Sequence, residues 1–318
     1  LNFVDIFGFL NVFKYITFRT GLSLFTSLII VLLIGGPFIS FFSNRKIVNP
    51  IRDDGPQDHI VKKIGTPTMG GVIILFGLLF SVLCWGDLSN TSVLFCIYIA
   101  ISFGLLGALD DYKKVKNNNS SGISSKFKIL SQVFLAILGI SLFVYYVDYQ
   151  EITNLYFPFF KNLIINLGWF FIPFSVFVIV GSSNAVNLTD GLDGLAAGCS
   201  SIVFCGLGTE ILLKSKPDLI IFSLLCFAMS GLCMGFLKFN KYPAKIFMGD
   251  SGSITIGAIL GSISILTNSY FTVFVISGIF IIETLSVIVQ VGFFKITKKI
   301  FHKGRRIFLM TPIHHHYE

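Results

Sequence analysis

The 318-residue chain is 54% hydrophobic and only 13% charged, and its mean hydropathy is +0.82. Soluble globular domains carry about a quarter charged residues, so these values exclude a soluble domain and indicate an integral membrane protein. The net charge of +8 does not point to nucleic acid as a partner, because the basic residues flank apolar runs, where they meet anionic lipid or phosphate.

Nine apolar runs are long enough to cross about 30 Å of hydrocarbon, which takes about 20 helical residues. They cover residues 22–42, 69–85, 92–109, 129–147, 169–186, 195–213, 219–237, 251–267 and 271–294. The residues before the first run have no basic start and no small-residue cleavage site, so this run is an anchor and not a signal peptide. The predicted fold is therefore an all-α, polytopic integral membrane helical bundle, in which residues 1–318 form a single transmembrane domain.

The Lys and Arg residues gather on one side of this bundle. If the first long polar loop is cytoplasmic, alternation of the spans puts 19 of the 24 basic residues in cytoplasmic segments. This bias is the one that the positive-inside rule describes. The predicted active-site loops on the cytoplasmic side are 43–68, 110–126, 184–194, 238–250 and 295–318.

The second span opens with Lys-Lys-Ile-Gly-Thr-Pro-Thr-Met-Gly-Gly at residues 62–71. Pro67 suits the first turn of a helix, where its missing N–H costs nothing. Lys63 and Thr68 could hold a phosphate, but an ordinary helix start with a basic membrane anchor explains the segment equally well.

Two carboxylates and two ammonium groups end the third span, in the sequence Asp110-Asp111-Tyr112-Lys113-Lys114. Adjacent side chains on a helix diverge by about 100°, so one Asp can face a metal or a phosphate while the other orients a partner. The alternative is a solvated helix end, although Asp at a helix C-terminus opposes the helix dipole.

Residues 184–195 read Asn-Ala-Val-Asn-Leu-Thr-Asp-Gly-Leu-Asp-Gly-Leu. On a helical turn, Asn187 and Asp190 point the same way, and so do Asp190 and Asp193, because residues three apart share a face. Such an oxygen-rich face suits a hard cation or sugar hydroxyls. The alternative is a polar turn between two helices that Asn and Asp cap.

Phe-Met-Gly-Asp-Ser-Gly at residues 247–252 precedes the eighth span. Asp250 is therefore expected near a helix N-terminus, whose free N–H groups attract anions. An N-cap is the alternative role. The Gly-Asp-Ser-Gly string also occurs in trypsin-like proteases, but those need a β-barrel that this chain cannot form.

The last polar groups lie within and after the ninth span. Glu283 and Gln290 are seven residues apart and share a helix face, and ionisable groups inside a membrane are functional candidates, with a hydrogen-bonded Glu inside the bundle as the alternative. His314, His315 and His316 lack the i, i+4 spacing of a helical zinc site. We expect them to hydrogen-bond to a diphosphate or neutralise it. A tag remnant is the alternative, although it would normally be longer and follow a linker.

Together and in this order, these motifs closely resemble the phospho-N-acetylmuramoyl-pentapeptide transferase family, within the polyprenyl-phosphate N-acetylhexosamine-1-phosphate transferase superfamily (glycosyltransferase family 4). The segments that carry the resemblance are 65–71, 110–114, 184–196, 247–252 and 314–318. The resemblance implies a Mg²⁺-dependent enzyme of the bacterial inner membrane, with its active site facing the cytoplasm. It implies transfer of phospho-MurNAc-pentapeptide from UDP-MurNAc-pentapeptide to undecaprenyl phosphate, giving lipid I and UMP, the first membrane step of peptidoglycan synthesis.

The resemblance also implies roles for individual residues. Asp250 resembles the Mg²⁺ ligand, and Asp110 and Asp111 resemble the other two catalytic residues. Asp110 is expected to deprotonate the acceptor phosphate, and a covalent aspartyl-phosphoryl intermediate is the alternative mechanism. The implied substrate-binding residues are Lys63, Thr68, Lys114, Lys126, Asn187, Asp190, Asp193, Asn240, Gln290, His314, His315 and His316.

The family has ten spans, so a tenth is expected after residue 318, and pairing into a homodimer within the bilayer is a further expectation. Two other functions stay open. An undecaprenyl-phosphate N-acetylglucosamine-1-phosphate transferase is the closest alternative. The His-His-His-Tyr-Glu motif at residues 314–318 and the Asn-Leu-Thr-Asp-Gly-Leu-Asp sequence at residues 187–193 favour the muramoyl enzyme. A membrane transporter should hold its ionisable groups near mid-membrane, whereas here all but Glu283 lie at one interface.

Overall fold

The computed structural model describes residues 8–45, 47–48, 65–118, 121–147, 153–157, 160 and 163–317. In chain order its elements are η1 (Gly8–Lys14), α2 (Ile16–Asn44), α4 (Gly71–Trp85), α5 (Thr91–Asn117), α6 (Ser125–Tyr146), β1 (Asn154–Tyr156), β2 (Ile164–Asn166), η2 (Gly168–Phe170), α8 (Phe171–Thr189), α9 (Leu195–Lys214), α10 (Ile221–Asn240), α11 (Asp250–Leu266), α12 (Tyr270–Ile276), α13 (Gly278–Phe301) and α14 (His314–Tyr317). Helices dominate, since lipid offers backbone groups no hydrogen-bond partner. The one sheet in these ranges is the antiparallel pair of β1 and β2.

The predicted all-α membrane bundle is confirmed. In the described part of the chain, seven helices are long and apolar enough to cross a membrane, and they are α2, α5, α6, α8 with η2, α9, α10 and α13. Two shorter apolar helices, α4 and α11, occupy the places of the second and eighth predicted spans. With 15 and 17 residues, they are about 22 and 25 Å long.

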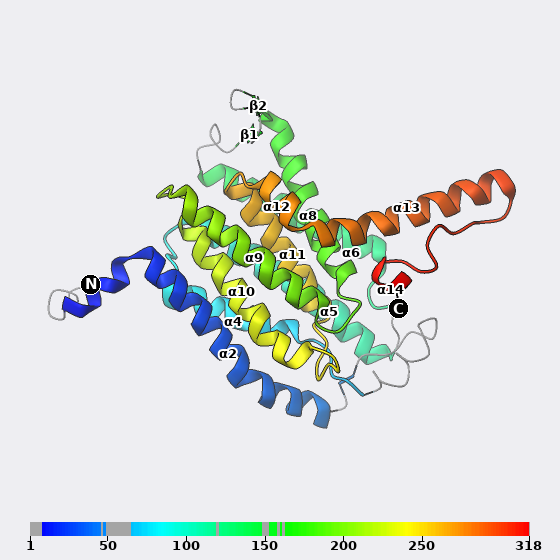
Figure 1. The fold of residues 1–318 in the computed structure, drawn as a ribbon, viewed down its shortest axis with the longest axis horizontal. Helices are drawn as coiled ribbons and strands as arrows, with labels where there is room; N and C mark the ends of the chain where they lie inside the picture. The colour runs from blue at the N-terminus through cyan, green and yellow to red at the C-terminus, as the bar shows by residue number, and fades with distance from the viewer. Residues whose placement is uncertain are drawn as a thin grey trace.

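The ninth predicted span, 271–294, is wrong as a single helix. It falls in two helices, α12 and α13, which are separated at Ser277. Ser and Gly are weaker helix formers than the apolar residues around them, and Ser277-Gly278 is where the helix breaks. Hydropathy does not register such a break, because one irregular residue hardly changes the mean of a long window. Beyond it, α13 points away from the bundle (Figure 1).

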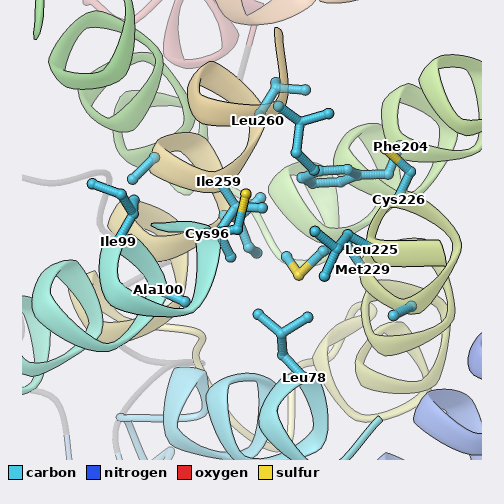
Figure 2. Packing of buried hydrophobic residues seen from close by; sticks show 14 of the residues in the cluster. Leu78, Cys96, Ile99, Ala100, Phe204, Leu225, Cys226, Met229, Ile259 and Leu260 are labelled. Carbon is cyan, nitrogen blue, oxygen red and sulfur yellow. The ribbon is translucent and has the colours of Figure 1, made fainter. Parts of the chain in front are cut away.

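The short helix α11 lies in the middle of the bundle (Figure 1), and all 17 of its residues are buried. Helices α4, α5 and α8 pack along it. Figure 2 shows side chains from separate helices meeting in this core, among them Leu78 of α4, Cys96 of α5, Met229 of α10 and Ile259 of α11. Because α11 is surrounded by protein, its polar N-terminus must find its hydrogen-bond partners within the protein.

Helices α2 and α10 approach each other closely through small residues. Gly231 of α10 lies against the Leu24 carbonyl of α2, and the Ser27 hydroxyl donates to the Ala228 carbonyl (2.9 Å). Within a membrane, close packing of small residues and hydrogen bonds between helices supply the association energy that apolar burial supplies in water. This contact places α10 and the loop that follows it.

We expect Gly231→Ala to lower the melting temperature of the detergent-solubilised protein, because the added Cβ would overlap the Leu24 carbonyl oxygen. Overpacking of this kind costs about 1–3 kcal/mol. The matched control is Gly21→Ala in α2, whose Cβ would have nothing within 4 Å. Since Ala favours helix over Gly, the control should melt at the same temperature as the wild type or higher. Equal melting temperatures for the two variants would contradict the close contact.

Candidate active site

Three carboxylates from two helices meet at the N-terminus of α11. Asp110 and Asp111 lie near the end of α5, and Asp250 is the first residue of α11. One carboxylate oxygen from each lies within 4.8 Å of the others. The structure thus brings together the three aspartates that were predicted to be catalytic, although α5 and α11 are far apart in the sequence.

Two ammonium groups bridge Asp110 and Asp250. Lys114 Nζ lies 2.7 Å from Asp110 Oδ2 and 3.1 Å from Asp250 Oδ2. Lys128 Nζ contacts the same two oxygens, and its distance from Asp110 Oδ2 is 3.0 Å. Both aspartates are buried, and a buried carboxylate is tolerated only when it is paired with positive charge or hydrogen-bond donors. The two lysines provide that charge at one point.

Asp111 caps α11. Its Oδ1 accepts a hydrogen bond from the backbone N–H of Asp250 (3.0 Å), and its Oδ2 accepts one from the N–H of Ser251 (2.9 Å). These are two of the N–H groups that a helix start leaves without a partner in its own helix. Gly249, at the N-cap position, has no side chain that could take this role. Lys114 Nζ also lies 3.8 Å from Asp111 Oδ1, so the two adjacent aspartates share this lysine and differ in their other partners.

Asn187 joins α8 to the cluster. Its Nδ2 donates to Asp250 Oδ1 (2.9 Å) and to Ser253 Oγ (2.8 Å). Asp250 is thereby held from both sides, by the lysines at Oδ2 and by Asn187 at Oδ1. The alternative role of Asp250 as the N-cap of α11 is wrong, because Gly249 holds that position and the Asp250 side chain points to other helices.

The helical turn predicted for Asp190 and Asp193 is also wrong. Helix α8 ends at Thr189, and both aspartates lie in the turn before α9. Glycines follow each of them, and glycine favours a turn over a helix. Asp193 Oδ2 accepts a hydrogen bond from the Ala244 N–H (2.9 Å). Instead of sharing a helix face with Asp190, Asp193 ties this turn to the loop after α10.

Two other predicted substrate-binding residues are buried close to these loops. Asn240 Oδ1 accepts from the Gly194 N–H (3.1 Å), and its Nδ2 donates to the Ile246 carbonyl (2.9 Å). Thr68 is only 2% exposed, and the nearby Gly70 N–H donates to the Phe247 carbonyl (3.0 Å). Asn240 thus supports the backbone around the site, and the substrate contacts of both residues stay predictions.

Lys128 is the charged residue that sequence reasoning missed. Lys126 was predicted in its place, but Lys126 is exposed. Residues two apart on a helix point in directions about 200° apart, so Lys126 and Lys128 cannot face the same neighbour. Gln132 of α6 is fully buried and lies four residues after Lys128, and this spacing is the signal that identifies the inward face. Lys63 lies outside the described residues.

The three histidines lie on α14. His314 is buried, with its Nδ1 3.0 Å from Glu283 Oε2, and its ring packs against Gly191 in the turn between α8 and α9. The His315 ring centroid is 4.2 Å from that of His314, and His316 accepts a backbone hydrogen bond at Nδ1. Through His314, the predicted histidine group therefore contacts the turn between α8 and α9.

The donor set of the aspartate cluster fits a hard divalent cation. Mg²⁺ prefers carboxylate oxygens and completes its shell with waters and substrate phosphates. The Oδ2 atoms of Asp110 and Asp250 share the same two lysine partners, whereas both oxygens of Asp111 accept backbone N–H groups. Asp110 and Asp250 are therefore the residues suited to hold the ion.

We expect Asp111→Ala to lower the melting temperature, because two buried N–H groups at the start of α11 would lose their acceptor. Each unsatisfied buried group costs about 1–3 kcal/mol. Asp111→Asn should lose less stability, since the amide oxygen still accepts one of the two bonds. Thermal unfolding in detergent, followed by tryptophan fluorescence, measures both. A melting temperature for Asp111→Ala equal to that of the wild type would contradict the capping role.

The chain matches the family model described as glycosyl transferase family 4 over residues 91–268, which include the three aspartates. It is 57% identical to the phospho-N-acetylmuramoyl-pentapeptide-transferase of Pelagibacter ubique (strain HTCC1062), over 99% of this chain and 89% of that protein. It is 46% identical to the protein of the same name from Thermodesulfovibrio yellowstonii, over the same shares of the two chains. For the Rickettsia felis protein of that name, the identity is 44% over 97% and 87%. The chain therefore belongs to glycosyl transferase family 4 and, within it, to the phospho-N-acetylmuramoyl-pentapeptide transferase family.

Proposed function

We propose that the protein transfers phospho-MurNAc-pentapeptide from UDP-MurNAc-pentapeptide to undecaprenyl phosphate, forming lipid I and UMP as the first membrane step of peptidoglycan synthesis. The names of its relatives support this reaction. The observation that carries it is the buried cluster of Asp110, Asp250, Lys114 and Lys128 at one end of a membrane bundle. A lipid-linked phosphate and a water-soluble diphosphate can meet only at such a boundary.

In this reaction, Lys114 and Lys128 bind phosphate oxygens, since phosphoryl transfer depends mainly on positioning and charge neutralisation. An oxygen of the acceptor phosphate attacks the phosphorus that is attached to the sugar and forms a new P–O bond. The bond from this phosphorus to the oxygen shared with the uridylyl phosphate breaks, and UMP leaves with the electron pair. Asp110 accepts the proton of the acceptor phosphate when that phosphate carries one.

We also propose Mg²⁺ as the cofactor, held by Asp250, which leaves Asp110 beside it to accept the proton. When bound, the ion would supply positive charge to the diphosphate. Asn187 donates to Asp250 Oδ1 and would keep this carboxylate in one orientation, as groups behind a metal ligand commonly do. Asp111 would contribute indirectly, by holding the backbone of Asp250 at the start of α11.

We place the protein in the bacterial inner membrane, with the site facing the cytoplasm. Of the 24 basic residues, 19 are expected on the side where α5 ends and α11 begins, and positive charge favours cytoplasmic loops. A nucleotide-linked sugar is present in the cytoplasm, so the site should face that side of the membrane.

The proposed activity predicts UMP release when purified protein is incubated with UDP-MurNAc-pentapeptide, undecaprenyl phosphate and Mg²⁺. Release should stop when EDTA removes the metal and should resume when Mg²⁺ is added in excess. A parallel reaction contains UDP-GlcNAc in place of the muramoyl substrate. UMP from the UDP-GlcNAc reaction alone would assign the protein to the N-acetylglucosamine-1-phosphate transferases instead.

Lys128→Ala should lower kcat/KM for UMP release about 10- to 100-fold, which corresponds to losing one hydrogen bond between charged groups. Lys126→Ala should cost less, because Lys126 is exposed on the other side of α6. Lys113→Ala, another exposed lysine, serves as the surface control. A larger loss in Lys126→Ala than in Lys128→Ala would contradict the role given to Lys128.

A further inference from the structure

Three polar side chains form one face of α13. Glu283, Gln290 and Thr297 follow one another at intervals of seven residues, which places them on the same side of the helix. Their exposed fractions are 4%, 8% and 4%, although most of α13 is not buried in the bundle. The chain that follows, here named the return segment (residues 302–313), runs back from the tip of α13 to α14 (Figure 1).

Thr297 and Gln290 bind the backbone of the return segment. Thr297 Oγ1 accepts a hydrogen bond from the Arg305 N–H (2.9 Å). Gln290 Oε1 accepts from the N–H groups of Ile307 (2.9 Å) and Phe308 (3.0 Å), and its Nε2 donates to the Phe308 carbonyl (2.9 Å). Gln290, predicted to bind substrate, therefore has both ends of its amide on the return segment.

Glu283 contacts the histidine group. Glu283 Oε2 lies 3.4 Å from the His314 backbone nitrogen and 3.0 Å from its Nδ1. The two side chains are only 6% and 5% exposed. The opposite nitrogen, Nε2, is directed at Gly191, where an added Cβ would overlap it. The imidazole thus spans the distance from α13 to the turn between α8 and α9.

We propose that Glu283 is a positioning residue, which fixes the ring of His314 against the turn between α8 and α9 and so delivers the histidine group to the active site. The inference rests on the proposed function and on the sequence-based expectation that the histidine group hydrogen-bonds to the diphosphate of the UDP-sugar. A carboxylate beside Nδ1 sets the ring orientation and holds a proton on that nitrogen, leaving Nε2 to act on the other side. The contact with His314 also explains why Glu283 is present in an apolar helix, where an ionisable residue without a partner would be costly.

Hydrogen–deuterium exchange of the full chain in detergent tests this placement without any substrate. Glu283→Leu replaces the carboxylate with an apolar side chain and so removes the acceptor, and peptides covering residues 305–317 should exchange several-fold faster than in the wild type. Glu283→Gln keeps an acceptor oxygen and should stay close to the wild type. Glu210→Leu, which removes a carboxylate paired with Lys214 at the end of α9, is the matched control and should leave these peptides unchanged.

Two results of the exchange experiment would overturn the proposal. One is wild-type exchange of residues 305–317 in Glu283→Leu. The other is equal acceleration in Glu283→Leu and Glu283→Gln, because the amide oxygen of Gln can still accept the bond from His314.

The kinetic test is a double-mutant cycle on kcat/KM for UMP release. Glu283→Leu should lower kcat/KM about tenfold, as the loss of a hydrogen bond to a charged group does. If Glu283 acts through His314, the double variant with His314→Ala loses no more than His314→Ala alone. Additive losses would overturn the proposal.

Gly191→Ala provides a second variant that leaves Glu283 in place. Its Cβ would displace the His314 ring, so Glu283→Leu should cause little further loss of kcat/KM in this background, and a full further loss would overturn the proposal. A wild-type protein that releases no UMP would contradict the proposed function, and the exchange experiment would then decide the role of Glu283 by itself.

Discussion

Helix α11 is enclosed by other helices and its first residues are buried, so the N–H groups at its start need acceptors from neighbouring residues. Asp111 of α5 satisfies two of them, and the arrangement of the site depends on this bond. It fixes the end of α5 against the start of α11. Because adjacent helical side chains diverge, the same bond directs Asp110 toward the lysines, and it holds the backbone of Asp250 where its carboxylate meets the same two ammonium groups.

The lysines then balance the charge that this arrangement creates. Asp110 and Asp250 bring two negative charges into a buried place, and Lys114 and Lys128 share their Oδ2 atoms. Ammonium groups on flexible stems can turn from a carboxylate to a phosphate with little change elsewhere. A cluster that is neutral within the protein is therefore also suited to receive an anionic substrate together with a cation.

The turn between α8 and α9 is the second meeting point. Asp193 accepts a hydrogen bond from the loop after α10, and Asn240 accepts one from Gly194 in the turn. His314, near the end of the chain, packs on Gly191. The last of these contacts depends on α13, a helix with little contact to the bundle. Its Glu283, Gln290 and Thr297 side chains bind the returning chain, so a helix that points away from the site still contributes to it.

Which residues become helix, and on which side the charged loops gather, could be predicted from the sequence, because the transfer of apolar residues into lipid depends on consecutive residues. The divergence of Asp110 and Asp111 was also predictable, because the angle between adjacent side chains is a local property of the helix. The break at Ser277, the turn at Asp190 and Asp193, and the choice of Lys128 over Lys126 were not. The weak helix propensity of Ser and Gly permits a helix to end at Ser277 and after Thr189 but does not require it. The choice of lysine depends on which face of α6 meets α5 and α11. Only the packed tertiary structure decides these points, because they depend on neighbours from other parts of the chain.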